Sequence, residues 1–253
     1  MADSGTQPQY GFEALRRHAI AHKLDMSMWV IRALALIFTF AYFIPIIGNP
    51  YNAYYRILLA NAAVSALRLH QRLPNPSISK EFVIKLFAED SCHYLLYSLI
   101  FLYVTPVSLV LLPVFLFCLV HFASSSLALL DLLGPNSWWG ARIFISLVEF
   151  QTGNILRLIA FTEIFLMPFV IILLFMGRAG LFTPLIYFHF LTLRYSSRRN
   201  PHTRSMFREL RNGTEKFANS PSVPAVIRNV VLSAVEVIAK LAPQQQAEPQ
   251  RSE

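Results

Sequence analysis

The segment from Glu89 to His93 places five chemically capable side chains next to one another. Its order is two carboxylates, a hydroxyl, a thiol and an imidazole. A metalloprotease site needs two histidines that flank a glutamate at helical spacing, and this segment has a single histidine. His18 and His22 share one face of a helix, but they lack the further ligands that a zinc site requires. We therefore predict no metal site and no cofactor.

The remaining sequence lacks the signatures of the common enzyme classes. It contains no nucleophile elbow, no phosphate-binding glycine loop and no motif of paired catalytic carboxylates. Nine glycines in 253 residues leave little material for nucleotide-binding loops. The two cysteines, Cys92 and Cys118, make no disulfide framework, and we interpret them as small buried hydrophobic residues. The sequence predicts a protein that is not an enzyme.

Glu163 is an acidic residue inside an otherwise apolar stretch. A charge at such a position needs an oppositely charged partner or a path to water. One interpretation pairs Glu163 with Arg32 or Arg56 of the first apolar block. The other, which costs less, lets the side chain extend to the membrane interface. A channel or carrier would need a continuous polar path and repeated halves, and the sequence indicates neither.

Residues 194–211 form the strongest polar signal, with six arginines and Glu209 as the single acid. Arginines just beyond a membrane segment attract anionic lipid headgroups, each by about 1 kcal/mol. They also suit acidic protein partners or an import receptor, and ordinary positive-inside anchoring is the alternative. No nucleic-acid-binding motif accompanies the charges, so we expect no nucleic acid partner. The six are Arg194, Arg198, Arg199, Arg204, Arg208 and Arg211.

The stretch from Val223 to Leu241 predicts an amphipathic helix, because its apolar residues recur at helical spacing. Pro221 and Pro224 mark its start and Pro243 its end. Leu232 is the one apolar residue that falls off the apolar face. The helix either lies in the membrane interface or packs on the cytosolic side of a helix bundle. The apolar face comprises Val223, Val226, Ile227, Val230, Val231, Ala234, Ile238 and Leu241.

The elements that must position these groups belong to a membrane domain. Hydrophobic residues make up 55% of the chain and charged residues 14%, and the mean hydropathy is +0.48. Residues 91–130 contain no Asp, Glu, Lys or Arg, whereas about a quarter of a soluble sequence is charged. A helix crosses the hydrocarbon core with about 20 apolar residues. This uncharged run therefore has room for two crossings.

The apolar material falls into three blocks, each interrupted near its middle by proline or glycine. The blocks cover residues 28–70, 82–133 and 155–194. The predicted breaks are Gly48–Pro50, Thr105–Pro106 and Gly177–Gly180, with Pro113 as a competing break in the second block. The predicted fold is an all-α integral membrane protein of helical hairpins, with three to six membrane segments and a C-terminal amphipathic helix. The limb from Tyr54 to Leu69 is short, about 24 Å as a helix.

The distribution of basic residues predicts the topology. The breaks carry only Arg178, whereas the connectors between blocks carry Arg68, Arg72, Lys80, Lys85 and Arg142, so the connectors and both termini are expected in the cytosol. An odd number of spans, with the limbs after Gly48 and Gly180 interfacial, is the alternative. The expected plan is a cytosolic segment (1–27), a membrane domain (28–194), a basic juxtamembrane segment (195–221), an amphipathic helix (222–242) and a disordered tail (243–253).

Four stretches of this sequence resemble one protein family. They are ALRLHQRLP at 66–74, EDSCHYLLYSLIF at 89–101, EIFLMP at 163–168 and FLTLRYSSRRNP at 190–201. In this order and spacing they resemble the transmembrane protein thirty-three family, also called the Krüppel homologue two family. The similarity extends over about residues 20–243, so it covers nearly the whole chain.

The resemblance implies a multi-pass protein of the endoplasmic reticulum membrane and nuclear envelope, without catalytic residues. Family members are linked to reticulons, whose tubule-forming activity they restrain, and to nuclear pore distribution and unfolded-protein-response signalling. The implied partners are the lipid bilayer with its anionic lipids and reticulon-type membrane proteins, with nucleoporins, an import receptor or a stress-sensor kinase as alternatives. The C-terminal amphipathic helix of the family corresponds by position to residues 223–241, which favours the interfacial alternative.

Overall fold

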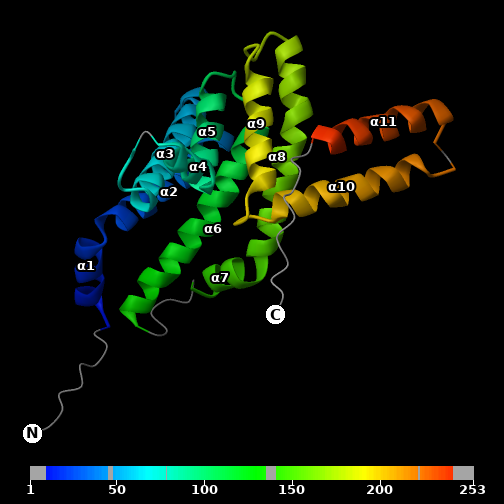
Figure 1. Cartoon of the computed structure of the whole chain (residues 1–253). Helices are drawn as coiled ribbons and strands as arrows, with labels where there is room; N and C mark the ends of the chain where they lie inside the picture. The colour runs from blue at the N-terminus through cyan, green and yellow to red at the C-terminus, as the bar shows by residue number, and fades with distance from the viewer. Residues whose placement is uncertain (1–9, 45–47, 78, 135–140, 222, 242–253) are drawn as a thin grey trace, which may run out of the picture.

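The computed structural model describes residues 10–44, 48–77, 79–134, 141–221 and 223–241, and within these ranges the regular elements are all helices (Figure 1). Three helical hairpins form the body of the molecule. Their helices are α2 (Lys23–Phe43) with α3 (Pro50–Arg72), α5 (Asp90–Leu102) with α6 (Ser108–Leu133), and α8 (Thr152–Phe175) with α9 (Thr183–Ser196). In the second hairpin, α5 packs on α3 and α9 rather than along α6. The all-α membrane fold predicted from the sequence is confirmed.

Each hairpin combines one long apolar helix with a shorter or more polar one. The long helices α2, α6 and α8 have 21, 26 and 24 residues and are, among the described residues, the ones long and apolar enough to cross a membrane. In contrast, α5 has 13 residues and α9 has 14. At 1.5 Å per residue both are about 20 Å long, which is less than the hydrocarbon thickness of about 30 Å. The described helices therefore include three candidate spans, the lower end of the predicted range.

The second limb of the first hairpin is longer than the sequence predicted. Asn49 caps α3, because its side-chain oxygen accepts a hydrogen bond of 2.8 Å from the backbone N–H of Tyr51. Pro50 suits the first turn of a helix, and α3 then continues to Arg72 for 23 residues, or about 34 Å. The expected 24 Å limb was wrong, because the cap and the polar last turn extend the helix beyond its apolar part.

The three hairpin breaks lie together at one end of the bundle. The hydroxyls of Tyr42 and Ser108, which stand beside the first and second breaks, are 2.8 Å apart. Thr105 in the second break donates to the carbonyl of Arg178 in the third, with its backbone N–H at 3.4 Å and its hydroxyl at 3.3 Å. The second break falls at Thr105–Pro106 as predicted, whereas Pro113 lies inside α6. This arrangement places the connectors at the opposite end.

Short helices occupy the N-terminal segment and the connectors. They are α1 (Phe12–Ala21), α4 (Lys80–Phe87), α7 (Ala141–Ile145) and a π-helix, η1 (Ser146–Gln151), that leads into α8. The expectation that residues 82–87 belong to the second block was wrong. Ser79 caps α4 by accepting the N–H of Phe82 at 3.1 Å, and the helix ends before α5 begins. Val83 and Ile84 are exposed on it.

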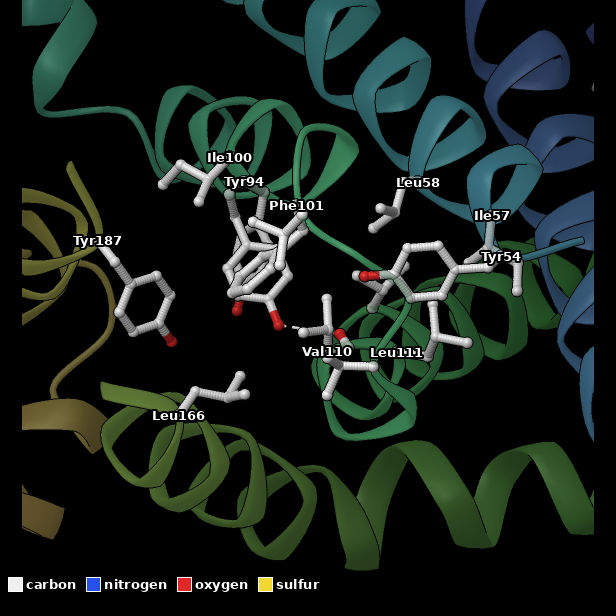
Figure 2. Close-up of a cluster of buried hydrophobic side chains, with 14 of the residues drawn as sticks. Tyr54, Ile57, Leu58, Tyr94, Ile100, Phe101, Val110, Leu111, Leu166 and Tyr187 are labelled. Carbon is white, nitrogen blue, oxygen red and sulfur yellow. Dashed lines mark hydrogen bonds between the residues drawn. The ribbon is translucent and has the colours of Figure 1, made fainter. Parts of the chain in front are cut away.

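An aromatic core joins the hairpins (Figure 2). The hydroxyl of Tyr97 donates to the carbonyl of Val110 at 2.8 Å, and that of Tyr187 donates to the carbonyl of Glu163, also at 2.8 Å. Both tyrosines are fully buried. Close packing and interhelical hydrogen bonds hold membrane helices together, since lipid offers no hydrophobic drive for their association. The core thereby determines how α5, α6, α8 and α9 sit against one another.

Candidate functional site: an ionic junction and the C-terminal helix pair

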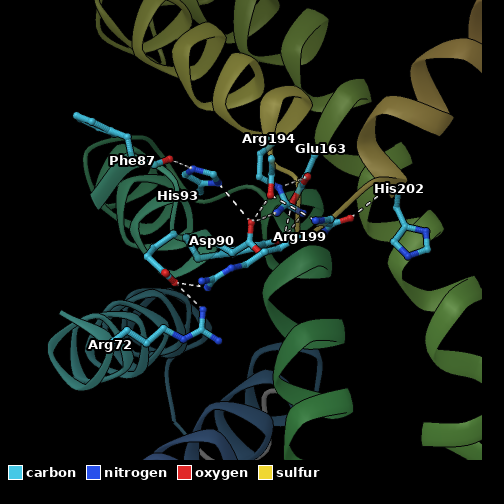
Figure 3. Close-up of polar contacts among 12 residues, drawn as sticks. Arg72, Phe87, Asp90, His93, Glu163, Arg194, Arg199 and His202 are labelled. Carbon is cyan, nitrogen blue, oxygen red and sulfur yellow. Dashed lines mark hydrogen bonds and ion pairs between the residues drawn. The ribbon is translucent and has the colours of Figure 1, made fainter. Parts of the chain in front are cut away.

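A buried ion pair lies where α9 meets α5 and α8. Glu163 of α8 and Arg194 of α9 are both 0% exposed, and Arg194 Nε donates to Glu163 Oε2 at 3.1 Å (Figure 3). Asp90, at the start of α5, accepts from Arg194 Nη1 at 3.3 Å. The hydroxyl of Tyr94 donates to the other oxygen of Glu163, and the guanidinium of Arg194 lies 5.1 Å from the Tyr94 ring centre. Every charge here therefore has a partner.

A second carboxylate extends this cluster to the first hairpin. Glu89 Oε2 accepts hydrogen bonds of 2.5 Å from Arg72 at the end of α3 and from Arg199 after α9. Burial raises the pKa of Glu89, but the two ion pairs outweigh burial and bring the pKa below its ordinary value. Glu89 is thus ionised at neutral pH and joins all three hairpins. We call these residues, namely Arg72, Glu89, Asp90, Tyr94, Glu163, Arg194 and Arg199, the ionic junction.

The expected partners of Glu163 were wrong. Arg56 is exposed, with its guanidinium 5.7 Å from the ring centre of Phe38, and Arg32 lies beside a different cavity. Glu163 does not extend to the interface either, because it is fully buried. Its true partner was detectable: Glu163 and Arg194 lie equally far, about 15 residues, from the centre of the third break. Two helices of an antiparallel hairpin bring such positions to the same level.

The Glu89–His93 segment contributes Glu89 and Asp90 to the ionic junction and does not form a reactive cluster. Ser197 donates to Asp90 at 2.9 Å, and the imidazole of His93 donates to the carbonyl of Phe87 at 2.7 Å. Within the part of the chain that the structure describes, no three His, Cys, Asp or Glu side chains are placed to hold a metal ion.

The C-terminal helix pair consists of α10 (His202–Ala218) and α11 (Ala225–Leu241). It projects sideways from the α8–α9 hairpin, with α11 on the side of α10 nearer the hairpin break (Figure 1). Arg157 of α8 fastens α10 through an ion pair of 2.8 Å with Glu209. Arg228 donates to the carbonyl of Ala218 at 3.0 Å and so fixes α11 against the end of α10.

The six arginines predicted to bind headgroups differ in their exposure. Arg194 is fully buried in the ionic junction, so its expected contact with lipid headgroups was wrong. Arg204 is half-buried, and its guanidinium lies 5.9 Å from the ring centre of Tyr195. The other four are exposed: Arg198, Arg199, Arg208 and Arg211.

An exposed apolar face runs along α11. Val226 is 75% exposed and Val230 is 64% exposed, and Ile227 and Ile238 are exposed as well. Other members of the predicted face lie differently: Val223 is buried and Val231 is half-buried against the rest of the pair. Leu232, the apolar residue off the face, is also half-buried, and the side chain of Leu241 lies outside the described residues. One side of α11 packs while the other remains open.

The sequence did not lead us to predict α10, because the many arginines of this segment make its short apolar side hard to recognise. Thr203, Phe207, Leu210 and Thr214 recur at helical spacing and indicate the inner face of an amphipathic helix. Phe207 and Leu210 help to enclose an apolar cavity of about 520 Å³. This cavity lies between the helix pair and the α8–α9 hairpin, and its other walls include Phe161, Phe165, Phe188 and Ile238.

Comparison with known proteins identifies the protein family. The family model described as Transmembrane protein 33/Nucleoporin POM33 matches residues 7–244. The chain belongs to this family. It is 51% identical to Krueppel homolog 2 of Drosophila melanogaster over 232 residues, which cover 92% of this chain and 83% of that protein. It is 43% identical to Transmembrane protein 33 of Mus musculus over 245 residues, which cover 96% and 99%. No solved structure matches this Transmembrane protein 33/Nucleoporin POM33 family member.

Proposed function

We propose that this family member is a non-enzymatic protein of the endoplasmic reticulum membrane and nuclear envelope that helps to organise the tubular network and restrains reticulon-type membrane shaping. The observation that carries the proposal is the open apolar face of α11, held on a helix pair that projects sideways from a candidate membrane hairpin. A helix with one apolar face and one polar face lies in the plane of a membrane interface.

The unequal helices of the hairpins support a shaping role. Because α5 and α9 are shorter than the hydrocarbon core, they occupy area nearer one leaflet than the other. The C-terminal helix pair adds area to the leaflet that we assign to the cytosol. The cavity beside Ile238 is apolar and suits a lipid acyl chain. Arg198, Arg208 and Arg211 are exposed and suit the anionic headgroups of the same leaflet.

Reticulon-type partners would meet this protein laterally within the membrane. Ile37 and Phe40 of α2 and Ile172 of α8 are exposed on candidate spans and offer apolar surface to a neighbouring helix. Such contacts leave the helix pair free to act on the lipid.

Overproduction in cells tests the proposal. Raising the level of the wild-type chain is expected to shift the balance of tubules and sheets and to co-isolate reticulon-type proteins. The variant Val226→Asp/Val230→Asp is expected to lose the shift in network shape and to keep the co-isolation. Asn229→Asp/Ser233→Asp places the same charges on exposed polar positions of α11 and serves as the matched control. An unchanged network on overproduction of the wild type would refute the shaping role.

A second candidate function is that of an adaptor for nuclear pore assembly or unfolded-protein-response signalling. It is favoured by the nucleoporin in the family description and by the exposed arginines of the C-terminal region. We expect Arg198→Gln/Arg208→Gln/Arg211→Gln to abolish co-isolation of soluble partners, such as an import receptor, if the adaptor function holds. A shaping protein would keep its reticulon association in the same variant, because that association is made laterally between membrane helices, so co-isolation separates the two functions.

A further inference from the structure

A basic cavity of about 250 Å³ lies between α2, α3, α5 and α6, beside the ionic junction. It adjoins a second cavity of about 210 Å³, and both are lined by Arg32 and Arg68. Arg72, Arg199 and His121 also line the larger cavity, and Asp90 is its one carboxylate among the described lining residues. Positive charge therefore dominates a polar space within the bundle.

Arg32 and Arg68 form no direct ion pair among the described residues, unlike the other arginines of the cavity. Arg32 is only 4% exposed, and no hydrogen bond or ion pair engages it among the described residues. The Nε atom of Arg68 is buried and has no hydrogen-bond partner. By contrast, Arg72 and Arg199 share Glu89.

The nearby carboxylates are already engaged elsewhere. Asp90 accepts from Arg194 and Ser197. Asp25, which lines the smaller cavity, accepts from Gln71 at 3.2 Å and forms no ion pair with either unpaired arginine. Asp25 attracts both guanidinium groups from a distance, but neither of them forms a direct ion pair, so two positive charges share the cavity with one carboxylate at longer range.

An unpaired buried guanidinium costs folding free energy, because it loses its hydration without gaining a partner. Its planar N–H donors match the oxygens of a phosphate group, and basic pockets between membrane helices bind phosphorylated headgroups. We propose that this cavity binds a phosphate monoester, held by Arg32 and Arg68. A monoester carries close to two negative charges at neutral pH, which matches the two unpaired arginines. This site is separate from the C-terminal helix pair and does not depend on the proposed function.

Thermal unfolding of the purified full chain in detergent micelles tests the proposal with three probes. Dioctanoyl phosphatidic acid carries the monoester on acyl chains, glycerol 3-phosphate carries it without them, and dioctanoyl phosphatidylcholine has chains but no monoester. We expect phosphatidic acid to raise the unfolding midpoint and phosphatidylcholine to leave it unchanged. A rise with glycerol 3-phosphate as well assigns the site to a soluble ester, whereas a rise with phosphatidic acid alone assigns it to a lipid.

Variants connect the response to the two arginines. We expect Arg32→Met to raise the unfolding midpoint without ligand, because it removes an unpaired buried charge, and to abolish the rise with phosphatidic acid. Arg68→Gln, at a partly exposed position, is expected to weaken binding of phosphatidic acid at least about tenfold. Arg56→Met, at an exposed position of α3, should keep the full response. An equal rise with phosphatidylcholine, or a full response in both Arg32→Met and Arg68→Gln, would overturn the proposal.

Discussion

Glu163→Gln is expected to lower the free energy of unfolding by about 3 kcal/mol, because it leaves the charge of a fully buried arginine without its main partner. Asp90, at 3.3 Å from Arg194, still neutralises part of the arginine's charge, so the loss of stability falls at the low end of the range for broken buried pairs. The measurement is equilibrium unfolding of the purified chain in mixed micelles of a mild detergent and sodium dodecyl sulfate.

Two further variants test whether the loss of stability comes from the broken ion pair or would follow any substitution at Glu163. Glu163→Met/Arg194→Met removes both charges and should recover much of the lost stability, since apolar side chains replace a buried ion pair without a large penalty. Arg157→Gln breaks the Arg157–Glu209 pair, whose side chains are 52% and 50% exposed, and should cost less than about 1 kcal/mol. A double variant less stable than Glu163→Gln would contradict the ion-pair account.

Val226→Asp/Val230→Asp is expected to weaken docking of α11 on a bilayer by about 100-fold or more. Burying a valine side chain contributes at least about 1.5 kcal/mol, so two residues contribute about 3 kcal/mol, and each 1.4 kcal/mol is a factor of ten. Both side chains are more than half exposed in the protein itself, so the change leaves the internal packing intact. Hydrogen–deuterium exchange of the α11 amides in lipid nanodiscs measures the docking as protection.

The matched control is again Asn229→Asp/Ser233→Asp, which adds the same two charges to the polar side of α11 and should keep the protection. Wild-type amides should exchange more slowly in nanodiscs than in small detergent-free amphipols, where no bilayer surface is present. If the wild-type amides of α11 exchange equally fast in both environments, the helix does not lie on the membrane.

The membrane hairpins were predictable because their signals are local. Apolar runs, proline and glycine breaks, and the i, i+3, i+4, i+7 pattern of α11 can all be read within a few turns of chain. The length of α3 was harder to predict from the sequence, since it depends on the cap at Asn49 and on a polar last turn. The helix α10 was hidden because its arginines dominate its composition, although the spacing of Phe207 and Leu210 was visible.

The site depends on contacts between segments that are distant in the chain. The sequence by itself determined that this is an all-α membrane protein, where its hairpins turn, and that its C-terminal region is basic and amphipathic. Only the tertiary structure decided that Asp90 and Tyr94 complete the environment of the Glu163–Arg194 pair, that Arg194 is buried rather than free for lipid, and that Arg32 and Arg68 share a cavity. The physical reason is that the environment of a charge is set by helix register and by every helix packed around it, whereas hydropathy and turn chemistry act along the chain.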